Sequence, residues 1–438
     1  MSEHQHMPAE KSFNRLLTIP KINPTCVDFN LPPSKSHMIR LLALSSIYPG
    51  KTKLITRGKI GRDIESMIGA MESLGVGIER YEKLGNYVTS VTGVGKQGFT
   101  DLESTVYCGN SGTALRIIMG LVASSDKPIT ISGDDSLSAR DNDFMINSLS
   151  QADVTVEKIQ TANLPVSICG PWYRGNTQSK TATIDCSKSS QALTSWMIAS
   201  ALFPCDVTVK LDGKTVSNKH YLLTKKMCND SGAKIEINGG KISLNRWEIQ
   251  LLPEYTIPGD SSIVSFAILL VKLHNCQARI SNWPENQDAL GNELLKEKAS
   301  SLGVEWVDNK ITNQHKSNFG VYDLTDCNDL ITPLSAILAI SGGGKISGIT
   351  HTIYKESNRI EKTIQLLSDF GLKIEYNGDS LDIGGGQIPK QPINAVNCHN
   401  DHRLFMTAVL LMSKFGGELI GQGLHAVADV DFMTRLGL

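Results

Sequence analysis

Hydrophobic and polar positions repeat along the chain in the same order. Each copy is an apolar run of helical character that ends at a small residue and is followed by alternating apolar and polar residues. Glycine suits a helix end that needs a positive φ, and alternation with a period of two is typical of a half-buried strand. We therefore predict a helix followed by a strand or hairpin in every copy. The copies cover 71–93, 147–170, 227–244, 298–312 and 366–385, with helix stops at Gly75, Ala152, Gly232, Gly303 and Gly371.

The copies predict an α/β (α+β) protein with two similar lobes, each built from three βαβαββ-type units. A sixth copy begins at 433–438, where MTRLGL supplies a helix and a stop without a strand. The alternating stretch TCVDFNLP at 25–32 can supply that strand and tie the two chain ends into one lobe. The alternative is that helix–strand segments simply look alike, and five copies at similar spacing argue against it.

Proline and glycine mark two crossings between the lobes, near 31–33 and 252–258. We place the N-terminal lobe at 32–253 and the second lobe at 254–438, completed by the N-terminal strand near 16–31. The two crossings are expected to lie side by side and to act as a hinge.

Five stretches carry polar residues or glycine directly into an apolar helix. They are LPPSKSHMIR (31–40), CGNSGTALR (108–116), SKSSQALT (187–194), PGDSSIV (258–264) and HNDHRLF (399–405). The start of a helix offers free N–H groups and the positive end of the dipole, which favour a phosphate or a carboxylate. Any one stretch is more simply a capped surface helix. Five of them in a repeated fold suggest helix N-termini that converge on one cleft between the lobes.

Two loops add charged side chains. One carries Arg140 among acidic residues, and the other carries Lys355, Glu356 and Arg359 in the order KESNR. Taken alone, Glu356 and Arg359 would form an exposed ion pair on one helix face, which contributes little to stability. Together with the polar helix starts, the same residues would add cations to an anion site.

Composition and charge narrow the class of protein. With 438 residues, 40% of them hydrophobic and 20% charged, the chain is typical of a soluble globular protein. Its net charge of −1 provides no general basic field, so we expect neither nucleic acid nor a membrane as a partner. Nine cysteines without a CxxC pair favour buried thiols in a reducing compartment over a disulfide scaffold or a zinc site.

The polar and charged residues 1–15 lack the apolar core of a secretory signal. No apolar stretch reaches the roughly 18 residues that a membrane helix needs. We therefore expect a flexible tail at 1–15 and a cytoplasmic protein, which we take to be a monomer.

Taken in chain order, these stretches resemble the enolpyruvyl transferases, and most closely the EPSP synthase branch of that family. The similarity covers about residues 25–438 and rests on the ordered motifs SKS, GNSGTALR, the arginine loop, SSQ, GD with serines, KESNR and DHR. The resemblance implies six similar units in two lobes. It also implies transfer of the enolpyruvyl group of phosphoenolpyruvate to the 5-hydroxyl of shikimate 3-phosphate, with no metal and no organic cofactor.

The resemblance assigns binding residues to these phosphorylated small molecules. Shikimate 3-phosphate is expected at Lys35, Ser36, Arg40, Ser189, Ser190, Gln191, Ser217 and Lys355. Phosphoenolpyruvate is expected at Lys35, Asn110, Gly112, Arg140, Gln191, Arg359 and Arg403. Substrates with several negative charges need several cations, and an arginine can hold a carboxylate through two parallel hydrogen bonds. Lys35 is expected to be catalytic, together with Glu356, whose pKa neighbouring groups would have to tune.

Two positions depart from the family pattern. In DCNDLITPLSAILA (326–339) Thr332 stands where the family carries a catalytic aspartate. A neutral threonine is not a base near pH 7. Asp329 lies three residues earlier, but Pro333 disfavours helical geometry just before it, which argues against Asp329 as a substitute. The family also uses a lysine near the C-terminus on the phosphate of phosphoenolpyruvate, and this chain has no lysine after Lys414.

These departures leave three kinds of function open. The chain can be a carboxyvinyl transferase that tolerates the changes, a diverged paralogue that performs an elimination or uses another acceptor, or a non-catalytic binder of the same ring. The cations and Glu356 favour enolpyruvyl chemistry over binding alone, whereas the lost aspartate and lysine favour divergence. We therefore expect turnover well below the usual ~1 to 1,000 per second, with binding of shikimate 3-phosphate retained.

Overall fold

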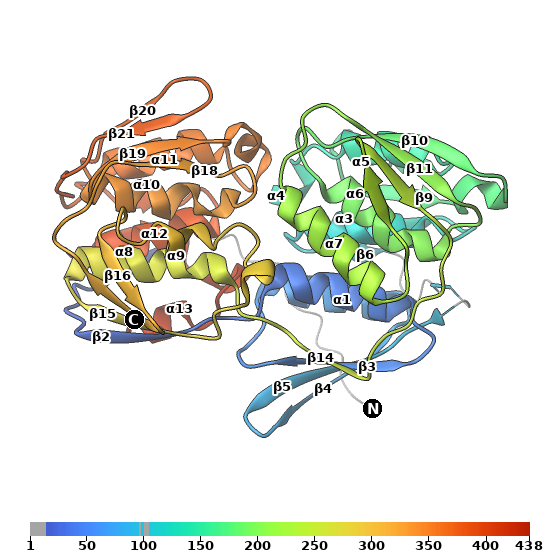
Figure 1. Cartoon of the computed structure of the whole chain (residues 1–438), viewed down its shortest axis with the longest axis horizontal. Helices are drawn as coiled ribbons and strands as arrows, with labels where there is room; N and C mark the ends of the chain where they lie inside the picture. The colour runs from blue at the N-terminus through green and yellow to red at the C-terminus, as the bar shows by residue number, and fades with distance from the viewer. Residues whose placement is uncertain (1–14, 96–97, 100–104) are drawn as a thin grey trace.

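The computed structural model describes residues 15–95, 98–99 and 105–438. Except for Arg15, the tail predicted at 1–15 lies outside these residues. Figure 1 shows two lobes side by side, one coloured blue to green and the other mainly yellow to red. Each lobe has its own hydrophobic core. The first core draws on positions 38–257, and the second combines positions 19–31 with positions 263–436.

The first lobe holds three four-stranded sheets and the helices that pack on them. Its strands are β3 (Lys51–Thr56), β4 (Gly77–Lys83), β5 (Asn86–Thr92), β6 (Val106–Tyr107), β7 (Ile129–Ser132), β8 (Thr155–Lys158), β9 (Val166–Cys169), β10 (Lys180–Asp185), β11 (Val207–Asp212), β12 (Glu236–Asn238), β13 (Lys241–Leu244) and β14 (Glu254–Thr256). Its α-helices are α1 (Lys35–Ile47), α2 (Arg62–Ser73), α3 (Gly112–Val122), α4 (Asp135–Ser138), α5 (Asp143–Ser150), α6 (Gln191–Ala199) and α7 (Asn218–Asp230), joined by the 3₁₀ helices η2 (Trp172–Gly175) and η3 (Ser200–Leu202).

The second lobe has two four-stranded sheets and one three-stranded sheet. Its strands are β1 (Leu16–Ile19), β2 (Cys26–Asn30), β15 (Gln277–Ser281), β16 (Val304–Val307), β17 (Lys310–Asn313), β18 (Gly320–Asp323), β19 (Gly344–Ser347), β20 (Ile374–Tyr376), β21 (Leu381–Ile383), β22 (Val396–Asn397) and β23 (Gly417–Ile420). Its α-helices are α8 (Val264–His274), α9 (Leu294–Glu297), α10 (Ile331–Ile340), α11 (Arg359–Asp369), α12 (His402–Met412) and α13 (Phe432–Arg435). Its 3₁₀ helices are η4 (Ser261–Ile263), η5 (Asn286–Asp288), η6 (Asn328–Leu330), η7 (Thr350–Tyr354) and η8 (Leu424–Val427).

The four-stranded sheets share one topology. In the order β10-β11-β13-β12, the first two strands are parallel and α6 connects them, while β12 and β13 form an antiparallel hairpin. The orders β6-β7-β9-β8 and β18-β19-β21-β20 repeat this arrangement. The orders β2-β15-β17-β16 and β14-β3-β5-β4 have the same strand pairing, but their two parallel strands come from distant parts of the chain. The succession of strand, helix, strand, helix and hairpin confirms the predicted two-lobed α/β fold of βαβαββ-type units.

Strands near the start of the chain complete sheets of the second lobe. β2 pairs in parallel with β15, and β1 pairs antiparallel with β23. The alternation at 25–32 suggested that this stretch supplies the strand of the sixth copy. In the structure that strand is β1, which pairs with β23, whereas 25–32 contains β2, which pairs with β15. The boundary predicted between 253 and 254 lies too early in the chain, because β14 pairs with β3 and Ile257 belongs to the first core. The segments between the lobes contact each other: Ser34 N donates to Pro258 O, and Asp260 N donates to Pro32 O, each at 2.8 Å.

Four of the five predicted helix stops have the backbone that glycine permits. Gly75, Gly232, Gly303 and Gly371 have φ values of 86°, 107°, 76° and 72°. Ala152 does not, since the left-handed residue of that copy is Asp153, with φ 61°. The prediction at Ala152 was wrong by one position, because aspartate tolerates this conformation better than most residues with a side chain.

Helices that begin at the boundary between the lobes are buried along most of their length. In α1 every residue from His37 to Ile47 is buried, and α12 is buried from His402 to Met412. Close packing of these helices fixes the position of their polar first residues. Among the described residues, none of the helices combines the length and apolar character that crossing a bilayer requires.

Candidate active site

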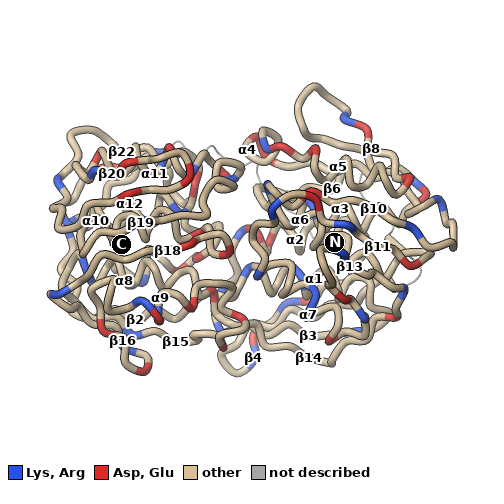
Figure 2. The backbone as a smooth tube through the Cα atoms, turned by 45° about the horizontal axis from the view of Figure 1, so that its top comes forward, with Lys and Arg blue, Asp and Glu red and all other residues tan. Residues whose placement is uncertain are grey.

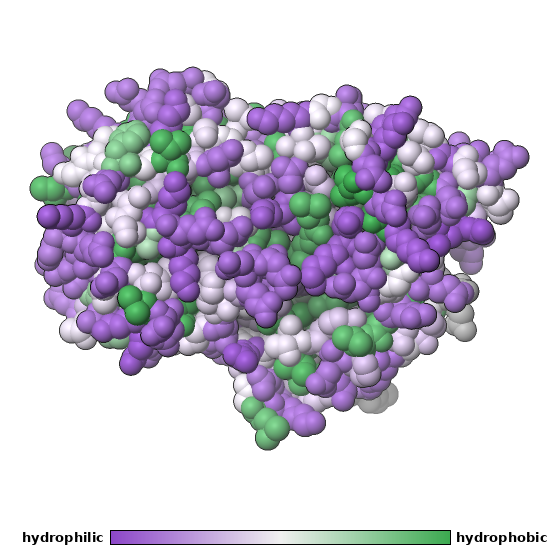
Figure 3. All heavy atoms as spheres, viewed as in Figure 1, coloured by the Kyte–Doolittle hydropathy of each residue, from purple (hydrophilic) through white to green (hydrophobic). Residues whose placement is uncertain are grey.

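A cleft between the lobes brings together the polar starts of α1, α3 and α6, whereas the predicted starts at 258–264 and 399–405 do not line it. Basic and acidic segments face each other along the boundary between the lobes in Figure 2, and hydrophilic side chains cover much of that boundary in Figure 3. The predicted residues that line the cleft are Lys35, Ser36, Arg40, Gly112, Arg140, Ser189, Ser190, Gln191, Ser217, Lys355 and Glu356. Three more lie against lining residues: Asn110 accepts a hydrogen bond from Arg140, and both Arg359 and Arg403 bind Asp329.

Lys35 stands at the first position of α1 and is held by an acidic residue of α2. Its Nζ donates to Asp63 Oδ2 at 2.8 Å. Burial opposes the charge of Lys35, but Asp63, Asp329 and Glu356 outweigh this effect and raise its pKa. Lys35 is therefore a fixed cation that faces two carboxylates of the second lobe.

Arg40 lies one turn further along α1 and is bonded to protein groups on several sides. Its Nε donates to Thr224 Oγ1 at 2.8 Å, and its other nitrogens donate to Ser36 O at 2.8 Å and His220 O at 3.2 Å. Burial lowers the pKa of Arg40 to about 10. Burial of His220 and the positive charge of Arg40 lower the pKa of His220 to about 3. Arg40 thus fixes α1 against α7, and His220 is neutral at ordinary pH.

The start of α6 supplies hydroxyl and amide groups to the first-lobe side of the cleft. Ser190 Oγ donates to Ser217 O at 3.2 Å, and Gln191 Nε2 donates to Thr113 Oγ1 at 3.0 Å. Arg116 donates to Gln191 Oε1 at 2.9 Å. These contacts join the starts of α3, α6 and α7 into one rigid wall of hydrogen-bond donors.

Arg359 is the centre of the charged cluster on the second-lobe side. This guanidinium is 1% exposed and donates to Asp329 at 2.6 Å, to Glu356 at 2.5 Å and to Asp401 at 2.8 Å. Arg403 donates to the other oxygen of Asp329 at 2.8 Å. Two arginines therefore hold Asp329 from two directions and orient it toward the cleft that it lines.

The cations decide the protonation of the cleft carboxyl groups. Burial alone would raise the pKa of Asp329, but Arg403, Arg359 and Lys355 together hold it well below its ordinary value. Burial likewise opposes ionisation of Glu356, and Arg359 and Arg140 outweigh it, so that its pKa is also well below normal. Both groups are carboxylates that a competing anion on the arginines would make more basic.

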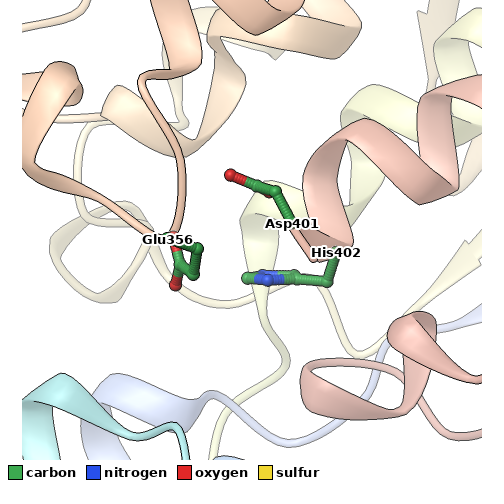
Figure 4. Close-up of side chains that lie close together, drawn as sticks. All are labelled: Glu356, Asp401 and His402. Atoms are coloured by element: carbon green, nitrogen blue, oxygen red, sulfur yellow. The ribbon is translucent and has the colours of Figure 1, made fainter. Parts of the chain in front are cut away.

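Glu356, Asp401 and His402 lie close enough together to suit a metal ion (Figure 4), with one ligand atom of each within 4.8 Å of the others. Both carboxylates already accept hydrogen bonds from Arg359. Burial and Arg403 hold the pKa of His402 well below its usual range, and among the described residues neither ring nitrogen has a hydrogen-bond partner. A cation here would compete with a guanidinium, whereas the neutral imidazole faces Glu356.

Thr332 does not stand in the site, and the prediction that placed it there is corrected by the structure. Its side chain is fully buried and its hydroxyl is 2.8 Å from that of Thr363, away from the lining of the cleft. Asp329 occupies the cleft instead, in η6 just before α10. Pro333 lies in the first turn of α10, where a helix tolerates proline because the missing N–H has no intrahelical partner there.

The C-terminal gap in the pattern remains. His425 packs against the ring of Phe405, with ring centroids 5.9 Å apart. Arg435 binds Asp429 at 2.5 Å. Burial lowers the pKa of His425 to about 4, and neither His425 nor Arg435 lines the cleft, so the structure offers no replacement from η8 or α13 for the lysine of the family pattern.

Some residues of the site have no role in the prediction from the sequence. Arg116 stands one turn into the helix that begins at GNSG, as the sequence indicates, but the resemblance assigns it no ligand. Asp63 lies 28 positions from Lys35, and no local pattern connects the two. Such partners are decided by tertiary packing.

The first turn of α7 is closed by a residue of the other lobe. Asn218 N donates to Asp326 Oδ1 at 2.5 Å, and Ser217 N donates to Thr325 O at 3.0 Å. Asn328 Nδ2 donates to Ser217 Oγ at 3.1 Å. Asp326 of the second lobe thus caps the N-terminus of α7 in the first lobe. This contact holds the two lobes together next to Ser217, a predicted binding residue.

Replacing Asp326 by alanine should lower the free energy of unfolding by about 1 kcal/mol, because the first turn of α7 loses its acceptor. Asp326→Asn keeps an acceptor oxygen and should lose much less. Urea denaturation of the two variants and the unchanged protein measures the difference. Equal losses in both variants would show that the charge of Asp326, rather than its capping oxygen, matters.

Comparisons with known proteins place these features in a family. The family model of EPSP synthase (3-phosphoshikimate 1-carboxyvinyltransferase) matches residues 21–428. A 3-phosphoshikimate 1-carboxyvinyltransferase of Korarchaeum cryptofilum is 28% identical over 415 residues, with 91% of this chain and 92% of the relative covered. The corresponding protein of Methanocella arvoryzae is 26% identical over 381 residues, with 86% of each chain covered.

Solved structures share the fold at lower identity. An EPSP synthase of Acinetobacter baumannii superposes with a TM-score of 0.69 at 23% identity and covers 96% of this chain and 97% of its own. The enolpyruvyl transferase NikO of Streptomyces tendae gives a TM-score of 0.71 at 14% identity, with 96% of each chain covered. The match of the family model over nearly the whole chain and the two-lobed fold of six units lead to one conclusion: the chain belongs to the EPSP synthase family.

Proposed function

We propose that the protein is a carboxyvinyl transferase that joins the enolpyruvyl group of phosphoenolpyruvate to the 5-hydroxyl of shikimate 3-phosphate and releases phosphate. One observation carries this proposal: Asp329 and Glu356 share the buried Arg359 in a cleft lined by cations from both lobes. A transferase of this type needs an acceptor for the hydroxyl proton, a donor to the methylene carbon and cations for the leaving phosphate. We assign these roles to Asp329, to Glu356 with Lys35, and to the cations that line the cleft.

Both lobes contribute residues to each proposed binding surface. Ser189, Ser190 and Ser217 lie on the first-lobe wall and Lys355 faces them from the second, which suits the phosphate of the ring. Arg140 and Lys35 suit the phosphate of phosphoenolpyruvate, and the pair Arg359 and Arg403 suits its carboxylate. The remaining proposed contacts are Ser36, Arg40, Asn110, Gly112 and Gln191.

Binding of the substrates would activate the two carboxyl groups. A substrate carboxylate on Arg359 and Arg403 takes over hydrogen bonds that now hold Asp329 and Glu356 in their ionised forms. The pKa of each carboxyl group then rises toward neutral pH. Asp329 can accept the proton of the 5-hydroxyl, and Glu356 with Lys35 can deliver a proton to the methylene carbon, which becomes a methyl group. When phosphate then leaves, a carboxylate of the same pair takes one proton back from this methyl group, so that the methylene of the enolpyruvyl product is restored.

A diverged paralogue was favoured by two departures, the lost aspartate and the lost C-terminal lysine. The first no longer supports it if Asp329 provides the carboxylate that Thr332 lacks. The missing C-terminal lysine still favours it. Release of phosphate with different substrate combinations separates the functions. A carboxyvinyl transferase needs both substrates, an eliminating paralogue releases phosphate from the phosphorylated ring alone, and a pure binder releases none.

We propose further that the protein works as a monomer in the cytoplasm. Residues of one chain form both walls of the cleft, so the site is complete without a partner. All nine cysteines are free thiols, which suits a reducing compartment. Sedimentation at micromolar concentration tests the first point.

Lys355 gives the binding of shikimate 3-phosphate a predictable pH dependence. Burial, helped by Arg359 and opposed by Asp329, lowers the pKa of Lys355 to about 8. Lys355 is charged below that pH and loses its charge as the pH rises through it. Because a phosphate monoester is already fully ionised there, with its second pKa near 6, binding should weaken from pH 7 to pH 9.5.

Calorimetric titration with Lys355→Met and Lys355→Arg tests this assignment. Lys355→Met should weaken binding about tenfold or more at pH 7, because a charge-assisted hydrogen bond is lost. Lys355→Arg should bind well, and neither variant should lose affinity between pH 7 and pH 9.5. A loss on the alkaline side that persists in Lys355→Met would assign the titration to another group.

A further inference from the structure

Lys188 is a cation of the cleft that the resemblance does not assign. It lies directly before Ser189 and lines the cleft. Its Nζ is 2.9 Å from Asp141 Oδ2 and lies 5.1 Å from the centre of the Tyr354 ring. Asp141 belongs to the first lobe and Tyr354 to the second, so Lys188 contacts both walls.

The partner of Lys188 is itself part of the cleft. Asp141 follows Arg140, its carboxylate accepts a hydrogen bond from Asp143 N at 2.8 Å, and its backbone oxygen accepts one from Arg116 at 3.2 Å. These contacts keep the Asp141 carboxylate in place independently of Lys188. Asp141 can therefore serve as a resting partner for a lysine that has a second position.

The ion pair between Lys188 and Asp141 is easy to open. The two side chains are 41% and 33% exposed, and ion pairs with this exposure contribute little to stability. A phosphate offers more negative charge and three acceptor oxygens, so it competes well with a single carboxylate. The ring of Tyr354 keeps the ammonium group near the cleft during such an exchange through a cation–π contact.

The neighbours of these residues indicate which anion Lys188 would meet. Ser189 and Ser190 follow Lys188 in the chain, and Lys355 follows its contact Tyr354. These three residues are the ones proposed to hold the ring phosphate. Lys188 and Lys355 would thus approach that phosphate from opposite lobes.

We propose that Lys188 is a further substrate-binding residue. As the substrate enters the cleft, Lys188 releases its ion pair with Asp141 and contacts the phosphate of the phosphorylated ring. The proposal rests on the proposed function for the identity of that ring. It assigns opposite roles to the two members of one ion pair: Lys188 attracts the substrate, and Asp141 competes with it.

The opposite roles give opposite expected effects. Lys188→Met should weaken the binding of shikimate 3-phosphate about threefold to tenfold, since a partly exposed charge contact is lost. Asp141→Asn should tighten it, because it frees Lys188 and removes a negative charge from the cleft. Calorimetric titration of both variants and the unchanged protein measures these changes, and raising the salt concentration should shrink them.

The chain offers a matched control pair on α7. Lys226 and Asp230 are also 2.9 Å apart, with side chains 48% and 57% exposed, and neither lines the cleft. Lys226→Met and Asp230→Asn make the same changes of charge, so they report the general effect of net charge on anion binding. Both should bind shikimate 3-phosphate as the unchanged protein does.

Two results would overturn the proposal. If Lys188→Met and Asp141→Asn weaken binding alike, the pair is only structural. If Lys188→Met changes affinity no more than Lys226→Met, Lys188 does not contact the substrate. The same titrations with inorganic phosphate keep the test valid if the unchanged protein fails to bind shikimate 3-phosphate, a failure that would overturn the proposed function instead.

Discussion

Asp329→Asn should lower turnover about 100-fold to 10,000-fold while shikimate 3-phosphate still binds. Asparagine keeps the shape of the side chain and can still contact Arg359, but it cannot take the proton of the 5-hydroxyl. Phosphate release in the presence of both substrates measures turnover, and calorimetry measures binding. The variant also removes one negative charge from Arg359 and Arg403, so binding of phosphoenolpyruvate should not weaken.

Thr332→Val is the companion variant for Asp329→Asn. The Thr332 hydroxyl is fully buried and bonded to Thr363, so its loss should cost about 1 to 3 kcal/mol of stability and leave turnover nearly unchanged. A drop in turnover as large as that of Asp329→Asn would place Thr332 in the catalytic machinery after all. Near-normal turnover by Asp329→Asn would remove Asp329 as the base.

Arg359→Met should have the largest effect on stability. The substitution leaves the carboxylates of Asp329, Glu356 and Asp401 without their shared partner, and loss of one member of a buried ion pair costs roughly 3 to 5 kcal/mol. Binding of phosphoenolpyruvate should fall below detection in the same variant. Chemical denaturation and calorimetry give the two values.

Arg279→Met provides the matched control for Arg359→Met. Arg279 binds Asp28 at 2.6 Å between β15 and β2, but both side chains are more than half exposed, at 56% and 66%. Solvent screens such a pair, so its loss should lower the free energy of unfolding far less than Arg359→Met does. If both variants are destabilised equally, the buried ion pairs of Arg359 contribute no more to the free energy of unfolding than an exposed pair does.

The repeated units could be predicted from the sequence because their signals are local. A glycine such as Gly232 and the alternation after it lie within one helix–strand segment, and the polar start of α1 is likewise contiguous. The same locality explains the mistake at Ala152, where the left-handed residue is Asp153. Neighbouring positions differ too little in composition to fix the residue at which a helix ends.

The pairs that complete the site could not be predicted in this way. Lys188 and Asp141 lie 47 positions apart, and Asn218 and Asp326 lie 108 apart, so packing of separate units brings each pair together. The choice between Asp329 and Thr332 depended on where α10 begins. The two residues are only three positions apart, yet Asp329 lines the cleft and the hydroxyl of Thr332 is buried in the core.

The pairing of β1 and β2 with strands of the second lobe affects the order in which the protein can fold during synthesis. The first lobe emerges from the ribosome as one continuous insertion and can close once β14 has paired with β3. β2 must wait for β15, and the contact between Asn30 and Arg435 joins residues 405 positions apart. The second lobe is therefore the slower to form, and β1 remains open to wrong partners until β23 has been synthesised.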